Sequence, residues 1–307
     1  MSEWGRPNRL DRCDDQRRDH DWVAEQWSRP DAALLRIDAE GHVATRPSAG
    51  LDYAIPTGTY QPSRHLLIGI VEGRPVFAED ADLASDSPTL RTVMDRLAPV
   101  DLQVAFTAAG LVIWHRSAVH CSACGTETEV RHAGSVRMCP GCAREWFPRT
   151  DPAIIVAVLD PDGRLLLGRQ PAWPQGRLSV FAGFVETGES LEQAVHREVA
   201  EEVGLPLTAV AYLGSQPWPF PRSLMVGFVA RTDQVEVKVR AEEIESARWF
   251  TRPDLESALV DGAVSLPAPT SIAFRMIQAW REERLPAPSV PLVQPTGPQD
   301  PLSHRPA

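Results

Sequence analysis

The sequence lacks any hydrophobic run long enough to cross a membrane. No uninterrupted apolar run exceeds seven of the 307 residues, as at 153–159 and 224–230, whereas a helix needs about 20 apolar residues to span a bilayer. Residues 1–21 are charged throughout and contain no apolar stretch of the kind found in secretory signals. We therefore expect no transmembrane segment, no membrane partner and a location in the reducing cytoplasm.

An excess of positive charge is also missing. The chain has 31 Lys and Arg against 41 Asp and Glu, a formal net charge of −10. A net-acidic surface repels phosphate at long range, which argues against a protein that binds nucleic acid by charge alone and against a DNA partner. A polyanionic substrate would need a local cationic device such as a bound divalent metal, so acidic residues are the first candidates for metal ligands.

Cysteines are few, five in all, and four of them form two Cys-x2-Cys pairs separated by a loop. Each pair turns two thiolates toward one point, and two pairs complete a tetrahedral site suited to zinc. Because the protein fills all four positions, we expect one structural Zn²⁺ per chain; buried free thiols or an iron centre are the alternatives. The predicted ligands are Cys121, Cys124, Cys139 and Cys142. The lone Cys13 is interpreted as an uninvolved thiol.

Changes in composition divide the chain into five segments. Residues 1–31 carry many charges of both signs and are predicted to form a flexible arm. Residues 32–116 alternate short apolar stretches with Gly and Pro breakers, which indicates a mixed α/β domain. The cysteine pairs predict a zinc ribbon over 117–148, and strand-like and helical stretches alternate over 149–281. The Pro-rich tail 282–307 is predicted to be disordered.

One helix is predicted with defined ends. Ser190 followed by Gln193 forms a capping box, and Gly204 is a good C-terminal stop, so a helix of about 13 residues lies between them.

Three carboxylates of this helix, Glu198, Glu201 and Glu202, are spaced i, i+3 and i+4 and must share one face. Like charges this close destabilise a helix unless a cation lies between them. Mg²⁺ or Mn²⁺ is the natural partner of such a cluster. A solvated acidic face, braced by Arg197 against Glu201, is the alternative interpretation.

Residues 183–205 match a longer pattern, G-x5-E-x7-R-E-U-x-E-E-x-G-U with U aliphatic, at every position. This pattern is the Nudix box, and through it the chain resembles the Nudix hydrolases. The resemblance implies that residues 149–281 form the Nudix α/β/α sandwich. The predicted fold class is therefore α+β: a Nudix sandwich with a four-cysteine zinc ribbon and an N-terminal mixed α/β domain. It also implies hydrolysis of a nucleoside diphosphate linked to another group.

The same resemblance implies roles for the residues of the box. Two to three Mg²⁺ or Mn²⁺ ions would be bound by Glu198 and Glu202, with Glu201 assisting as a ligand or base. Arg197 would orient a carboxylate, that of Glu189, and the backbone carbonyl of Ala182 would be a further metal ligand. The implied catalytic residues are Arg197, Glu201 and Glu202.

Beyond the box, residues 215–223 read SQPWPFPRS. Alternating Pro keeps this segment extended and presents Trp218 and Phe220 as flat apolar faces. Without context, such a segment is more often a packed Pro-rich loop. After a Nudix box it resembles the SQPWPFPxS signature of the NADH pyrophosphatase subfamily, whose members also place a four-cysteine ribbon and an extra N-terminal domain before the catalytic domain.

The subfamily resemblance implies cleavage of NADH or NAD⁺ to NMN(H) and AMP, and removal of NAD caps from the 5′ ends of RNA. It also implies a homodimer in which the signature segment of one subunit helps to complete the site of the other. The implied substrate contacts are Phe147, Phe184, Gln216, Pro217, Trp218, Pro219, Phe220, Pro221, Arg222 and Ser223.

Four more positions carry over from the subfamily. Glu243 matches an acidic residue that completes the metal cluster, with one more surface Glu as the alternative. Ala273 resembles a small residue whose backbone meets substrate, or it packs in a helix. Arg91 resembles an arginine that approaches substrate phosphate, or it is an exposed structural Arg. Gly134 stands where a relative has an acidic substrate contact, so that contact is expected to be absent.

Two other functions fit parts of these patterns. A dinucleotide or nucleoside-diphosphate-sugar pyrophosphatase of broader specificity would use the same box. A zinc-ribbon RNA-binding protein with a silent catalytic fold is the other, but the intact carboxylate set and the acidic balance argue against it.

Overall fold

The computed structural model describes residues 9–46, 50–286 and 288, and the chain divides into two compact units. The first contains the described residues up to 151 together with 217–224. The second contains 152–216 and the described residues from 225 onward.

Across the described part of the chain, we find no helix with both the length and the apolar character needed to cross a bilayer.

A five-stranded sheet forms the centre of the first unit, with strand order β1-β4-β5-β2-β3. Strands β4 and β5 pair antiparallel, and β2 pairs parallel with β5. The strands are β1 (Leu10–Asp11), β2 (Ala33–Ile37), β3 (Tyr53–Ala54), β4 (His65–Val71) and β5 (Arg74–Asp80).

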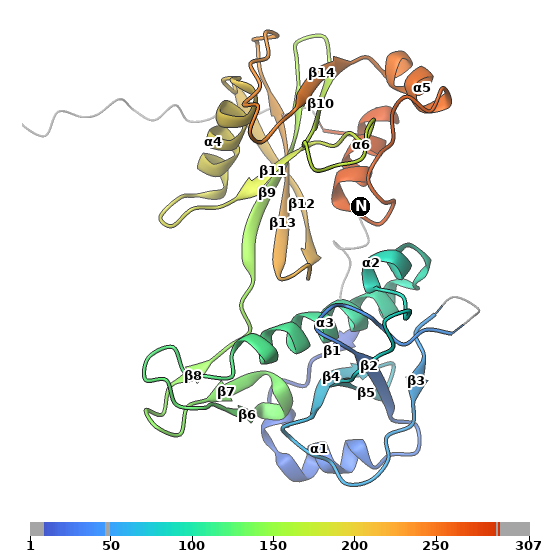
Figure 1. Ribbon diagram of the computed structural model, residues 1–307, viewed down its shortest axis with the longest axis vertical. Helices are drawn as coiled ribbons and strands as arrows, with labels where there is room; N and C mark the ends of the chain where they lie inside the picture. The colour runs from blue at the N-terminus through green and yellow to red at the C-terminus, as the bar shows by residue number, and fades with distance from the viewer. Residues whose placement is uncertain (1–8, 47–49, 287, 289–307) are drawn as a thin grey trace, which may run out of the picture. The chain divides into compact units, whose positions relative to one another are not determined.

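Helices cover both faces of this sheet, α1 (His20–Trp27) on one and α3 (Pro99–Ser117) on the other (Figure 1). Pro99 at the first turn costs α3 no hydrogen bond, because that N–H has no partner in a helix. Between β5 and α3 the chain forms α2 (Leu90–Val93) and a 3-10 turn, η3 (Met94–Arg96). These fall in the N-terminal mixed α/β domain predicted over 32–116.

The expected flexible arm over residues 1–31 is wrong for the part that the structure describes. Asp19 caps α1 by accepting from two backbone N–H groups, and Val23 and Trp27 are buried. A further 3-10 turn, η2 (Gln16–Arg18), precedes α1, and Cys13 is buried rather than held in a flexible arm. Of the charges that suggested disorder, Asp21 and Glu25 lie on the exposed side of α1, while Arg17 is buried and donates a hydrogen bond to the carbonyl of Leu67.

The cysteine pairs lie in the segments next to the strands of a small three-stranded sheet of order β6-β7-β8. Its strands are β6 (Glu129–Arg131), β7 (Val136–Met138) and β8 (Glu145–Trp146), with a 3-10 turn, η4 (His132–Gly134), between the first two.

The second unit is built on a sheet of order β12-β13-β9-β10-β14, to which β11 adds by pairing with β9. Its strands are β9 (Asp151–Leu159), β10 (Leu165–Arg169), β11 (Phe181–Phe184), β12 (Ala209–Trp218), β13 (Ser223–Arg231) and β14 (Ser246–Phe250). The unit boundary falls within β9 and near the facing ends of β12 and β13.

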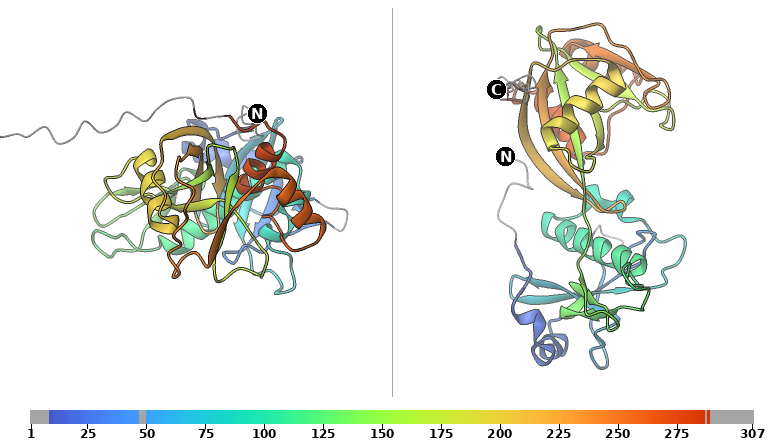
Figure 2. Two further views of the ribbon diagram at one scale, coloured as in Figure 1. Left: turned by 90° about the horizontal axis from the view of Figure 1, so that it is seen from above. Right: turned by 90° about the vertical axis from the view of Figure 1, so that its left-hand side faces the viewer.

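Helix α4 (Leu191–Val203) lies on one side of this sheet, and α6 (Ile272–Arg281) lies on the other (Figures 1 and 2). Helix α5 (Arg252–Val260) follows β14. The core beneath α6 is apolar, and Trp280 is buried in it with its indole N–H donating to the carbonyl of Gly163 at 2.9 Å. The predicted α/β/α sandwich is confirmed. Most of the predicted disordered tail, 282–307, lies outside the described residues.

Candidate active site

Helix α4 begins and ends where the sequence predicts. The Ser190 side chain accepts a hydrogen bond from the backbone N–H of Gln193, and the Gln193 side chain accepts one from the backbone N–H of Ser190. Gly204 ends the helix at φ +69°. The caps fix both ends of the helix. Its buried residues are Ala194, Val195, Val199, Glu202 and Val203, so one carboxylate shares the buried side of α4.

The carboxylates of α4 differ sharply in exposure. Glu202 is 4% exposed, the side chain of Glu198 is 12% exposed and that of Glu201 is 43% exposed. The Oε2 atom of Glu202 is buried without a hydrogen-bond partner. Burial, and then the charges of Glu198, Glu243 and Glu201, raise the pKa of Glu202 to about 8.

This arrangement fits a divalent cation. A buried carboxylate oxygen without a donor, with other carboxylates beside it, is costly unless a cation compensates it. Burial also raises the pKa of Glu198, although Arg197 opposes the shift. The acidic side chains are not drawn into a tight cluster: in the described part of the chain, the group with ligand atoms all within 4.8 Å of one another is the cysteine group.

Arg197 organises the loop before the helix. Its guanidinium donates two hydrogen bonds of 2.8 Å to Glu189, one of 2.9 Å to Glu198, one of 3.1 Å to Glu201 and one of 2.9 Å to the carbonyl of Phe184. These bonds lower the pKa of Glu189, whose Oε2 also accepts from the backbone N–H of Glu186. Arg197 therefore fixes Glu189, as the box resemblance implies, and ties the loop to the carboxylate face.

Strand β11 brings the start of the box against this face. It pairs antiparallel with β9, with Ala182 opposite Ile155 and Gly183 opposite Ile154. A Cβ atom at Gly183 would overlap the carboxyl group of Glu198, so only glycine lets the strand pass this close. Sequence reasoning treated Gly183 only as part of the pattern, and nothing in its neighbours signals this packing.

Glu243 lies on a turn that docks on the end of α4. The backbone N–H groups of Lys238 and Arg240 donate to the carbonyls of Val203 and Glu202, each at 3.0 Å. These carbonyls have no partner within the helix. Because this turn contacts the end of α4, the charge of Glu243 adds to the effect of burial in raising the pKa of both Glu198 and Glu202.

The guanidinium of Arg240 lies 3.5 Å from the carboxylate of Glu243. Sequence reasoning did not single out Arg240, because only the fold brings its segment to α4.

The four cysteines of the ribbon form the expected tetrahedral type of site. The Sγ atoms of Cys121 and Cys142 are 3.7 Å apart, and those of Cys124 and Cys139 are 3.4 Å apart. The four Sγ atoms all lie within 4.8 Å of one another, as the ligands of a single ion must. Spacing and chemistry fit Zn²⁺, and no position remains open for catalysis.

A side chain at Gly134 of this ribbon would be strained in the present fold. The φ of this residue is +99°, and a Cβ atom would lie 2.7 Å from Cδ2 of Leu66. At the position where a relative has an acidic substrate contact, this chain instead packs a glycine closely against Leu66 of β4.

Two predicted stacking platforms are strongly exposed: Phe147, after the ribbon, is 50% exposed, and Phe184, in the box, is 58% exposed. Rings this exposed leave a large apolar face free for a ligand. Ala273, by contrast, is buried near the N-terminus of α6, so only its backbone could meet substrate.

Gln216, the first residue of the signature segment implied to contact substrate, is completely buried. Its amide nitrogen donates to the carbonyl of Thr270 at 2.9 Å, and its amide oxygen accepts from the N–H of Ile272 at 2.6 Å. Both ends of the amide are therefore used to hold the end of β12 against the start of α6.

The following residues, 217–224, belong to the first unit. The side chain of Ser223 is buried, and Arg222 donates to Asp151 at 2.7 Å. Trp218 is half-buried, and its ring meets Phe220 edge to face at 5.1 Å.

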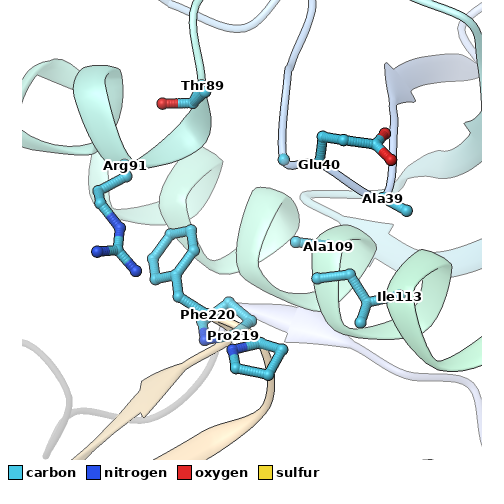
Figure 3. Close-up of a pocket in the computed structure, with 10 residues that line it drawn as sticks. Ala39, Glu40, Thr89, Arg91, Ala109, Ile113, Pro219 and Phe220 are labelled. Atoms are coloured by element: carbon cyan, nitrogen blue, oxygen red, sulfur yellow. The ribbon is translucent and has the colours of Figure 1, made fainter.

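Phe220, Pro219 and Pro221 line a cavity of about 400 Å³, and Arg91 lies on its wall above the ring of Phe220 (Figure 3). The segment is therefore packed on its own unit as well as partly exposed.

Two known domain families match this chain. The NUDIX domain matches residues 149–267, and the NADH pyrophosphatase zinc ribbon domain matches residues 116–147.

Among curated proteins, the chain is similar to the NAD-capped RNA hydrolase NudC of Mycobacterium bovis, with 40% identity over 289 residues that cover 88% of this chain and 92% of the relative. It is also similar to the human NAD-capped RNA hydrolase NUDT12, with 40% identity over 189 residues that cover 58% of this chain and 41% of the relative.

A solved NUDIX hydrolase from Nitrosomonas europaea has a TM-score of 0.42 and 19% identity, and the match covers 54% of this chain and 91% of that one.

Proposed function

Because this chain belongs to the NADH pyrophosphatase subfamily of the Nudix hydrolases, we propose its reaction from the residues described above. The protein is a metal-dependent hydrolase that cleaves the diphosphate of NADH or NAD⁺ to NMN(H) and AMP, and that removes NAD caps from RNA 5′ ends. The observation that carries the metal chemistry is the buried, unpartnered Oε2 of Glu202 among neighbouring carboxylates.

Divalent ions, Mg²⁺ or Mn²⁺ and two to three per site, would be held by Glu198, Glu202 and Glu243 with the carbonyl of Ala182. Bound there, they would neutralise the diphosphate and make water a better nucleophile. Glu201, the most exposed carboxylate of the three at positions 198, 201 and 202, would assist as a further ligand or as the base.

Arg197 keeps Glu189 and the loop in place for this chemistry. Its bonds to Glu189, Glu198 and Glu201 gather these carboxylates around one cation, which offsets their mutual repulsion before any ion is bound.

In this proposal, the aromatic residues and the signature segment bind the two nucleoside parts of the substrate. The exposed ring of Phe184 in the box would stack on one ring of the substrate, and the subfamily resemblance assigns further ring contacts to the exposed Phe147 and the half-buried Trp218. We further propose a homodimer in the cytoplasm, in which the signature segment of one subunit completes the site of the other.

A panel of substrates tests the assignment to NAD-type substrates. We expect Trp218→Ala to lower kcat/KM for NADH, NAD⁺ and NAD-capped RNA by about 10-fold or more, since ring contacts of this kind contribute on the order of 1–3 kcal/mol. A nucleoside-diphosphate sugar has one base ring where the dinucleotide has two, so its kcat/KM should fall less. Equal losses on all substrates would favour the broader pyrophosphatase instead. Sedimentation of the wild type tests the dimer.

A further inference from the structure

The ring of Phe220 is held on two sides by the N-terminal α/β domain. Phe106 of α3 meets it edge to face, with ring centroids 6.0 Å apart and planes at 89°. The guanidinium carbon of Arg91, on α2, lies 4.9 Å from the centroid of the same ring. Figure 3 shows Arg91 turned toward Phe220, while Pro219 lies against the side of α3 that carries Ala109 and Ile113.

Phe220 in turn meets Trp218, with centroids 5.1 Å apart and planes at 76°. The residues between and beside them are prolines at 217, 219 and 221, each of which fixes its own φ. Few backbone rotations therefore separate the two rings, and because the rings are in contact, we expect a change in the position of Phe220 to move the indole of Trp218.

The cavity beside Phe220 is poorly suited to phosphate. Its lining is mostly apolar, and its charged residues are one cation, Arg91, and one anion, Glu40. The only anion among the described residues that line the cavity, Glu40, lies 3.7 Å from Arg116, so neither charge is directed at a ligand phosphate. Arg91 already uses its charge on the face of Phe220, an arrangement that attracts a guanidinium to an aromatic ring.

We propose that the N-terminal domain is a specificity element for dinucleotide substrates, in which Arg91 and Phe106 hold Phe220 and thereby set the orientation of Trp218. Arg91 is then a positioning residue and not a phosphate ligand. This inference rests on the proposed function for the identity of the substrate, but the coupling from Arg91 to Trp218 exists in the free protein.

Kinetics of Arg91→Met test the proposal. Methionine keeps much of the side-chain stem and removes the cation, and Arg91 is exposed, so folding should be preserved. The expected result is a rise of about two- to fivefold in KM for NADH, with kcat nearly unchanged. ADP-ribose has the same adenosine and diphosphate but no nicotinamide, and its KM or inhibition constant should not change. Arg91→Lys should recover most of the loss.

Two controls separate positioning from other effects. Arg96→Met removes the same charge from the next turn and should leave the NADH constants unchanged. In a Phe220→Leu background, Arg91→Met should have no further effect, because the ring through which it acts is gone. Equal weakening for NADH and ADP-ribose, or an undiminished effect in the Phe220→Leu background, would show that Arg91 acts on the phosphates and would overturn the proposal.

A measurement without substrate distinguishes this inference from the proposed function. The indole N–H resonance of Trp218, identified by its loss in Trp218→Phe, should shift in Arg91→Met and stay in place in Arg96→Met. An unmoved resonance in Arg91→Met overturns the proposal even if NADH is hydrolysed. If the resonance shifts but the protein does not hydrolyse NADH, the coupling from Arg91 to Trp218 stands and the assignment of NADH as substrate is wrong.

Discussion

At the scale of single residues, Glu202 combines burial with nearby negative charge. Its pKa is raised to about 8, first by burial and then by Glu198, Glu243 and Glu201. The same carboxyl group has a pKa of 4.5 when unperturbed. Folding without divalent metal therefore favours the protonated form of Glu202, and metal binding must displace that proton.

The stability of the metal-free fold should reflect this shift. The contribution of Glu202 is fully present below pH 4.5 and is lost as pH rises toward about 8, because the unfolded chain releases the proton first. We expect Glu202→Gln, which cannot ionise, to be more stable than wild type at pH 8 by on the order of 3 kcal/mol and about equal at pH 5. Thermal melts of zinc-loaded protein freed of Mg²⁺ and Mn²⁺ measure this.

Mn²⁺ provides the control for this prediction. It should raise the melting temperature of the wild type at pH 8 and have little effect on the variant. A wild type that is no less stable than Glu202→Gln at pH 8 would contradict the buried, unpartnered state of this carboxylate.

At the scale of elements, α4 and the turn that carries Glu243 are one assembly. Gly204 ends the helix in the left-handed region at φ +69°, and it also lets Lys238 approach: a Cβ atom on Gly204 would lie 3.1 Å from Cβ of Lys238. The turn then supplies N–H donors to the last carbonyls of α4. The final glycine of the box thus serves both the helix end and the placement of Glu243.

A matched pair of glycines separates these two roles. Gly262 has nearly the same φ, +70°, with open space around its missing Cβ. Gly204→Ala and Gly262→Ala should each cost about 1 kcal/mol of stability from the left-handed backbone. Only Gly204→Ala should also raise the Mn²⁺ concentration needed for half-maximal binding. An equal effect of the two variants on Mn²⁺ affinity would show that the approach of Lys238 does not position Glu243.

The elements differ in how well the sequence predicts them. Helix α4 could be bounded closely because its capping box and its glycine stop are both local signals. Helix α3 was not predicted, because it is apolar around much of its circumference and shows no clear period. The contact between Phe220 and Phe106 could not be predicted from the sequence either, because it joins residues more than 100 positions apart that share no pattern.

At the scale of the whole molecule, the zinc ribbon is fastened to the N-terminal domain by a buried polar network. Arg137 donates to the hydroxyl and carbonyl oxygens of Thr128 and lies 3.1 Å from Nδ1 of His115. The other ring nitrogen of His115 lies 2.8 Å from the carbonyl oxygen of Gly134. Burial, with a smaller contribution from Arg137, lowers the pKa of His115 to about 4, so this network holds a neutral imidazole.

Acid should loosen this attachment. An ordinary histidine has a pKa of 6.5, so the contribution of His115 is present above that pH and is lost as pH falls toward about 4. Denaturant unfolding should show the wild type losing up to about 3 kcal/mol relative to His115→Gln over this interval. His20→Gln, a change at an exposed histidine of α1, should follow the wild type. Parallel pH profiles for wild type and His115→Gln would contradict a buried neutral His115.

The metal-dependent hydrolysis of a dinucleotide diphosphate is tested most directly by product analysis. NADH would be incubated with Mn²⁺ or Mg²⁺ and wild type, Glu202→Gln, or Glu192→Gln, which makes the same change in the first turn of α4 away from the buried carboxylates. We expect NMNH and AMP in equal amounts from wild type and Glu192→Gln, and a rate at least about 100-fold lower from Glu202→Gln. Absence of this product pair from folded, zinc-loaded wild-type protein, or an unimpaired Glu202→Gln, would contradict the account.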